Sequence, residues 1–192
     1  KSPLWFLDIL LLLSLLIGFW LRERFQWQFV TLSRTQAGTV FIVLSWLVGM
    51  LYELTLSESP GNMGGLHDKT IPSFILAQGF YIPFAVLSYF LIRKFHFSFR
   101  DVFLMAGLVS LYEALQYGVP RTLFSPLFFL TPLVLAYYVV VYAQFLTLPL
   151  LVVDETLLWH GDKPRLLWWH KVLYGLVLGI TCWLTLGLWG TV

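Results

Sequence analysis

Residues 125–153 read SPLFFLTPLVLAYYVVVYAQFLTLPLLVV and contain no charged side chain. A helix of roughly 20 apolar residues crosses the hydrocarbon core of a bilayer, which is about 30 Å thick. This stretch is therefore long enough to span a membrane as a helix. The whole chain agrees with that interpretation, because 59% of its residues are hydrophobic and only 11% are charged. Such a balance is typical of a protein solvated by lipid.

Five other apolar runs also have the length of a membrane-spanning helix. The six predicted helices cover residues about 4–20, 37–57, 71–92, 102–119, 125–153 and 166–189. A transmembrane β-barrel would instead show short segments of alternating polarity, and the sequence has none. We therefore predict an all-α integral membrane protein. Because the loops are short, we expect one compact bundle of six helices in a single domain, residues 1–192.

The first run could be read as a signal peptide or as a helix. Its positive charges, Arg22 and Arg24, follow the apolar stretch, and no small-residue cleavage pattern closes it. These features favour a retained helix over a cleaved leader. The loop at residues 22–36 mixes Arg with Phe and Trp, which suits a segment in the membrane interface or an ordinary connector.

Lysine and arginine residues gather in alternate loops of the predicted bundle. They are Arg22, Arg24 and Arg34 in the first loop, Arg93, Lys94 and Arg100 in the third, and Lys163, Arg165 and Lys171 around the fifth. The other side carries only Lys1, Lys69 and Arg121. By the positive-inside rule, loops 1, 3 and 5 are cytoplasmic and both termini lie outside. We expect a prokaryotic-type cytoplasmic membrane.

Two glutamates occur in the same local context, in LYELTLSESP at residues 51–60 and LYEALQYGVP at residues 111–120. The alignment of Leu51 with Leu111 also aligns Pro72 with Pro132. This pattern suggests a helical hairpin, predicted helices two and three, repeated in parallel as helices four and five. Chance matches between two apolar hairpins would give a similar picture.

Both glutamates, Glu53 and Glu113, are predicted near the outer ends of their helices. A carboxylate at the centre of the bilayer costs roughly 2.5 kcal/mol or more, so one that persists usually faces the bundle interior, a water-filled cavity or the interface. Each glutamate also heads a stripe of small or polar residues at helical spacing. These stripes are Ser45, Gly49, Glu53 and Ser57, and Ala106, Ser110, Glu113, Gln116 and Tyr117.

Other polar side chains share this outer level of the predicted bundle. They are Asp8, Gln78 and Gln116, under outer loops that hold His67, Asp68 and Arg121. The inner half is poor in buried polar groups, Gln144 and Thr147 being the main ones. A channel or an alternating-access carrier needs polar groups along its whole path. The asymmetry therefore predicts a polar cup that opens to the outer surface or outer leaflet.

Two carboxylates in one low-dielectric pocket suit a proton donor and acceptor pair. We therefore predict that the protein binds or chemically converts a hydrophobic small molecule or lipid, with Glu53 and Glu113 in acid/base roles. The predicted ligand-binding residues are Gln78, Gln116, Tyr52, Tyr112, His67, Asp68, Tyr81, Asp8 and Arg121. In the alternative interpretation both glutamates lie in the headgroup zone, solvated or paired with Lys69 and Arg121, and only end their helices.

Other functional classes find little support in the sequence. His67 and Asp68 suit an acid–base pair, half of a metal site or a solvated loop, and we predict no metal and no cofactor. Cys182 stands alone, and phosphate-binding loops, HExxH, GxSxG and EF-hand motifs are absent. Cations spread over three loops do not form a nucleic-acid surface. Two alternatives stay open: a non-catalytic accessory subunit of a larger membrane complex, and a small transporter or substrate-capture component.

The predicted order of helices, with a glutamate late in the second and a polar fourth, resembles the sterol isomerase and sigma-2 receptor group of small membrane proteins. One turn before Glu53, where that group has a histidine, this chain has Gly49. It also has a sixth predicted helix. No residue role is therefore carried over from that group.

Overall fold

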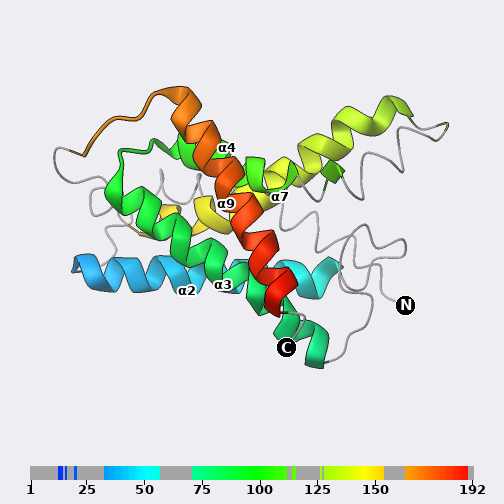
Figure 1. Cartoon of the computed structure of the whole chain (residues 1–192), viewed down its shortest axis with the longest axis horizontal. Coiled ribbons are helices and arrows are strands. Elements are labelled where there is room, and N and C mark those ends of the chain that lie inside the picture. Colours follow the sequence, from blue (N-terminus) through cyan, green and yellow to red (C-terminus); the bar gives the residue numbers. More distant parts are fainter. Residues whose placement is uncertain are drawn as a thin grey trace.

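A computed structural model describes most of the helical part of the 192-residue chain. The described residues are 33–56, 71–111, 114–115, 126, 128–153 and 163–189, with Leu13, Ser14, Leu16 and Trp20. In this part of the chain the regular structure is helical (Figure 1). The α-helices are α2 (Arg34–Leu56), α3 (Ile71–Lys94), α4 (Phe99–Val109), α7 (Thr131–Val152) and α9 (Trp168–Trp189), and a 3₁₀ turn, η2 (Phe128–Leu130), precedes α7.

The apolar runs become helices close to where the sequence predicts them. The predicted helices 37–57, 71–92 and 166–189 correspond to α2, α3 and α9. The predicted 125–153 helix is η2 followed by α7, and Pro132 stands in the first turn of α7, where a missing N–H does no harm. No strand occurs among the described residues apart from an isolated bridge between His96 and Arg165.

Three helical segments are long and apolar enough to cross a membrane: Thr35–Tyr52, Phe128–Val152 and Trp168–Leu188. These segments support an integral membrane protein. Of the predicted first helix, 4–20, the structure describes four residues, all helical. Of the predicted 102–119 helix, α4 covers the first part, and residues 112–113 and 116–119 lie outside the described residues. The six-helix bundle, the single domain and the hairpin repeat stay predictions.

Close contacts at glycines show that α2 and α3 run antiparallel. Gly38, near the start of α2, packs against Tyr89 in the second half of α3, whereas Gly49 packs against Tyr81. A Cβ atom added to Gly49 would overlap Cδ1 of Tyr81, so only glycine leaves room for this ring. Small residues at helix crossings generally serve this purpose in membranes.

Helix α9 runs parallel to α4. Gly175 faces the carbonyl of Met105, and Gly179, one turn later, faces Val109. A Cβ atom at Gly175 would stand 3.0 Å from that carbonyl oxygen, so the two backbones approach closely. This spacing is the small-xxx-small pattern of packed membrane helices.

A proline inside α3 is compensated by α9. Pro83 has no N–H, so it cannot donate to the carbonyl four residues earlier, which belongs to Gly79. The hydroxyl of Thr185 lies 2.9 Å from that carbonyl oxygen and 2.8 Å from the carbonyl of Cys182, and it shares its hydrogen between them. Helix α9 thus supplies the donor that α3 lacks, and this contact places the start of α3 beside the end of α9.

Candidate functional site

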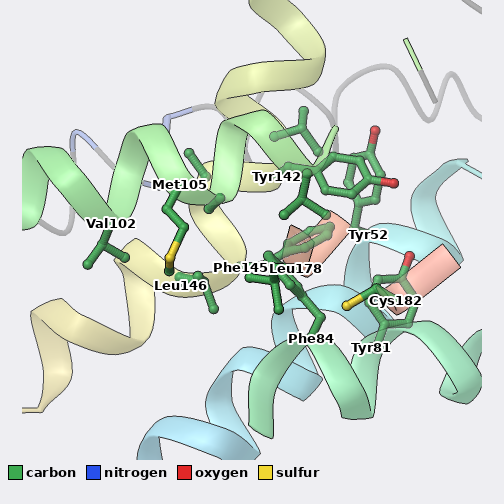
Figure 2. Packing of buried hydrophobic residues seen from close by; sticks show 14 of the residues in the cluster. Tyr52, Tyr81, Phe84, Val102, Met105, Tyr142, Phe145, Leu146, Leu178 and Cys182 are labelled. Carbon is green, nitrogen blue, oxygen red and sulfur yellow. The ribbon is translucent and has the colours of Figure 1, made fainter. Parts of the chain in front are cut away.

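Seven aromatic side chains meet where α2, α3, α7 and α9 pack together. We call this group the aromatic junction; it consists of Tyr52, Phe80, Tyr81, Phe84, Tyr142, Phe145 and Trp183. Phe145 lies at its centre, and its ring centroid is 5.1 Å from that of Tyr142, 5.5 Å from Tyr52 and 5.6 Å from Tyr81 (Figure 2). The rings are tilted or edge-on, which are favourable arrangements for aromatic pairs.

Phe80 extends the aromatic junction toward α9. Its centroid lies 5.2 Å from Trp183, 5.5 Å from Tyr81 and 5.9 Å from Tyr142. Trp183 thus packs inside the protein with the rings of α3. The aromatic junction is therefore a continuous layer of rings from α2 to α9.

Two of the predicted ligand-binding tyrosines belong to this layer. Tyr52 is 3% exposed and Tyr81 is 7% exposed. The ring of Phe145 packs against both of them. They come from different helices, α2 and α3, and α7 brings them together. The sequence named both tyrosines as ligand-binding residues but gave no sign that Phe145 would join them.

Gln78, the third predicted site residue that the structure describes in full, is bound by α2. Its side-chain oxygen accepts a hydrogen bond from the indole N–H of Trp46 at 2.5 Å, and its amide nitrogen lies 2.9 Å from the sulfur of Met50. These contacts fix the orientation of the amide at the α2–α3 crossing, where Met50 stands two residues before Tyr52 in the chain. Gln78 therefore holds the two helices together.

The two predicted catalytic residues are less fully described. Glu53 follows Tyr52 in the helical backbone of α2, and its side chain lies outside the described part. Glu113 also lies outside it, although Ala114 beside it is fully buried and donates its N–H to the carbonyl of Ser110 at 2.9 Å. The remaining predicted site residues outside the described part are Asp8, His67, Asp68, Tyr112, Gln116 and Arg121. Their roles and the pairing of the glutamates stay predictions.

Gln144 is a buried polar residue to which the sequence interpretation gave no role. It precedes Phe145 in α7, is fully buried, and neither atom of its amide has a hydrogen-bond partner among the described residues. Thr147, by contrast, donates to the carbonyl of Ala143 in its own helix at 2.8 Å. Buried amides without partners are rare and call for an explanation, such as an internal water or ligand. The sequence did contain a signal for this residue: Gln144 is the only amide within the uncharged run 125–153, and a polar group inside a membrane helix usually has a function.

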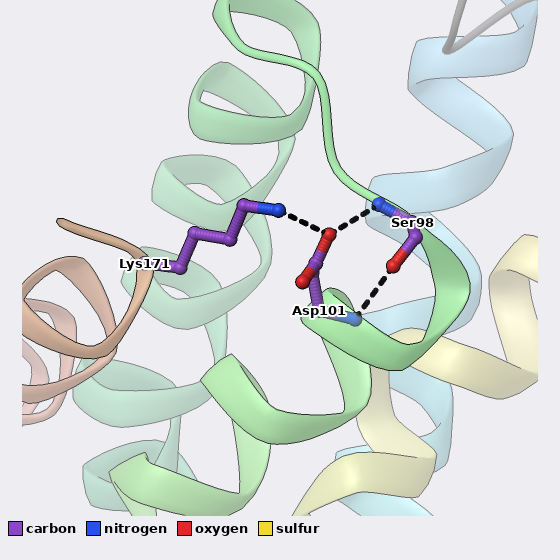
Figure 3. A network of polar contacts seen from close by, with 3 residues as sticks. All are labelled: Ser98, Asp101 and Lys171. Atoms are coloured by element: carbon purple, nitrogen blue, oxygen red, sulfur yellow. Dashed lines mark hydrogen bonds and ion pairs between the residues drawn. The ribbon is translucent and has the colours of Figure 1, made fainter. Parts of the chain in front are cut away.

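At the other end of α3 and α9, polar contacts fix the start of α4 (Figure 3). Ser98 accepts a hydrogen bond from the N–H of Asp101 at 3.2 Å, and its own N–H donates to the Asp101 carboxylate at 2.8 Å, which forms a capping box. Lys171 of α9 donates to the same carboxylate oxygen at 2.5 Å. The pattern Ser-Phe-Arg-Asp at residues 98–101 carries this signal, which explains why α4 begins at Phe99 rather than at the predicted residue 102.

The surroundings of Asp101 act on its charge in opposite directions. Partial burial raises the pKa of Asp101, while the hydrogen bonds from Lys171 and Ser98 and the positive charge of Lys171 lower it. The lowering contributions win, so the pKa lies below the usual 3.8. Asp101 is therefore ionised near neutral pH and acts as a structural anchor between α4 and α9.

No group of three or more His, Cys, Asp or Glu side chains that could hold a metal occurs among the described residues. Comparison of the chain with protein-family models, curated proteins and solved structures gives no match. The functional proposal therefore depends on the chemistry of the residues themselves.

Proposed function

We propose that the protein binds or chemically converts a hydrophobic small molecule or lipid at a polar cup that opens to the outer surface, with Glu53 and Glu113 as proton donor and acceptor. The observation that supports this proposal is the convergence of Tyr52, Gln78 and Tyr81. The sequence singled out these residues from two separate helices, and they lie together at and beside the aromatic junction.

An aromatic layer beside a few polar groups suits an apolar ligand. Binding sites for small molecules are lined mostly by hydrophobic and aromatic side chains, and a small number of polar groups fix the orientation of the ligand. The aromatic junction would supply the apolar surface. Glu53, next to Tyr52 in the chain, would bring the first carboxylate to its margin.

Two amides have different roles in this proposal. Gln78 is held by Trp46 and Met50, so it is a positioning residue that keeps α2 and α3 in register. Gln144 has no hydrogen-bond partner among the described residues and lies next to Phe145. Its amide would form hydrogen bonds with a polar group of the ligand or with an internal water. Tyr52 and Tyr81 would contact the apolar body of the ligand.

Carboxylate-to-amide variants test the proposal. The protein is purified in mild detergent after expression in a membrane that supplies native lipids, and small molecules that stay bound are identified by native mass spectrometry. We expect Glu53→Gln and Glu113→Gln each to reduce the retained ligand, or its turnover, at least tenfold, while the melting temperature stays the same. Glu58→Gln is the matched control, because the sequence places this carboxylate beyond the predicted helix end.

The outcomes separate the competing hypotheses. If both variants retain the ligand as the parent does, the acid/base assignment is wrong. If no small molecule is retained and other membrane chains co-purify instead, the accessory-subunit alternative replaces the proposal. A water-soluble ligand that binds only from the outside would favour the substrate-capture alternative.

A further inference from the structure

The described cations collect at one end of the helices, away from the aromatic junction. Arg93 and Lys94 end α3, Arg100 lies in the first turn of α4, and Arg165 precedes α9. The backbone N–H of His96 donates to the carbonyl of Pro164 at 3.2 Å, so the segment before α9 is fastened to the turn between α3 and α4. Two segments far apart in the sequence, residues 93–100 and the segment before α9, thus bring their positive charges to one surface.

Four of these cations are exposed and form the cationic rim: Arg93, Lys94, Arg100 and Arg165. Lys163 and Lys171 differ from them, because Lys163 donates to the carbonyl of Ile92 at 3.2 Å and Lys171 pairs with Asp101. Arg93, Arg100 and Arg165 form no ion pair with any described residue. Lys94 has only a ring contact, 5.4 Å above the centroid of Phe95. The charges of the rim are therefore available to an external anion.

Large apolar side chains stand beside the rim at the start of α9. Trp168 is 75% exposed, Leu167 61% and Trp169 48%. Exposed tryptophans next to arginine and lysine at the end of a membrane-spanning helix are typical of the headgroup level of a bilayer. At that depth, the anions that meet the rim are lipid phosphates.

We propose that the cationic rim binds the headgroups of anionic phospholipids, with Trp168 and Trp169 inserted beside them. Arginine donates two parallel hydrogen bonds to phosphate oxygens, and three of the four rim cations are arginines. Basic surfaces on the cytoplasmic side of membrane helices bind acidic lipids in this way. The cationic rim lies at the end of the molecule opposite the proposed cup. Lipid binding there does not depend on the proposed function.

The test compares lipids that differ only in headgroup charge. The detergent-purified full chain is titrated with phosphatidylglycerol and with phosphatidylcholine of the same acyl chains, and bound lipids are counted by native mass spectrometry at low and high salt. One basic residue near a lipid surface contributes roughly a fivefold change in affinity. We expect the parent to prefer phosphatidylglycerol at least tenfold, and the preference to weaken at high salt.

Paired variants locate the interaction. We expect Arg93→Gln/Lys94→Gln and Arg100→Gln/Arg165→Gln each to lower the affinity for phosphatidylglycerol at least fivefold. All four side chains are exposed, so each pair should leave the melting temperature unchanged. The matched control, Lys1→Gln/Lys69→Gln, removes two cations from the predicted outer side and should keep the preference.

Three results would overturn the proposal. The first is a parent protein that binds both lipids equally. The second is that both pairs of rim variants keep the preference, which would place the lipid contact elsewhere on the protein. The third is displacement of phosphatidylglycerol by excess inorganic phosphate, which would show a site for a soluble anion instead.

Discussion

The aromatic junction and the anchor at the start of α4 both fasten α9 to its neighbours, but by different forces. At the junction, Phe145 packs against rings from α2, α3 and α7 with few directed polar contacts. At the anchor, the Asp101 carboxylate receives hydrogen bonds from Ser98 and from Lys171 of α9. The first region depends on the volume and shape of its side chains, and the second on charge and hydrogen-bond geometry.

The difference teaches where each kind of perturbation should act. Between helices in lipid there is little hydrophobic driving force, so close packing and hydrogen bonds hold them together. The stability contributed by the aromatic junction should then fall when side-chain volume is removed and should not change with pH. The stability contributed by the anchor should instead change with pH and salt and depend little on side-chain volume.

Removal of the central ring should give the largest effect. Phe145→Ala would leave a cavity at a side chain that is 1% exposed, and we expect a loss of about 3 kcal/mol in the free energy of unfolding. Phe129→Ala is the control, because Phe129 is 63% exposed and its removal should change stability by less than about 0.5 kcal/mol. Unfolding in one detergent measures both. Equal losses would contradict the view that the junction depends on packing.

A double-mutant cycle on the proline contact should give an intermediate effect. Thr185→Val removes the donor to Gly79, and we expect a loss of about 1 kcal/mol. In the Pro83→Ala background the same replacement should matter less, because residue 83 then supplies its own N–H to that carbonyl. The measurement is the stability of the four proteins under identical conditions. A loss from Thr185→Val that is the same in both backgrounds would argue that the hydroxyl does not serve this carbonyl.

The charge at the anchor should give the smallest effect. Asp101→Asn keeps an oxygen for the Ser98 N–H but removes the charge that faces Lys171, so we expect a loss below about 1 kcal/mol near neutral pH. The folded-state pKa of Asp101 lies below the usual 3.8, so its ionised form stabilises the fold above about pH 3.8. This contribution disappears as the pH falls through the lower folded-state pKa. The melting temperatures of parent and variant should therefore converge in acid and stay apart at neutral pH; a constant gap would count against the ion pair.

The positions of α2, α3, α7 and α9 could be predicted from the sequence because each coincides with a long, mainly apolar run. The start of α4 was missed because Arg100 and Asp101 look like loop residues until Ser98 is recognised as their cap. The central position of Phe145 could not be predicted. In a run where nearly every position is apolar, no regular change of polarity distinguishes the buried face from the lipid-facing one.

The candidate site was predicted in part. Tyr52 and Tyr81 were predicted as ligand-binding residues, and both pack against a third ring, Phe145, that the sequence did not indicate. Gln78 was chosen as a polar group facing a ligand, yet its amide is engaged by Trp46 and Met50. Which partner an intramembrane amide selects depends on the register of two packed helices, and a single sequence does not contain that information.

The contact between Thr185 and Gly79 also bears on the order in which the protein is assembled. The donor hydroxyl is synthesised 106 residues after the carbonyl that it serves. In the predicted bundle, α3 therefore enters the bilayer with one backbone oxygen that its own helix does not satisfy, in a solvent that offers no replacement. A chain halted before α9 would keep a weak point at Pro83, where water or an assisting protein could bind. When α9 is inserted, Thr185 supplies the hydrogen bond that the Gly79 carbonyl of α3 has lacked until then.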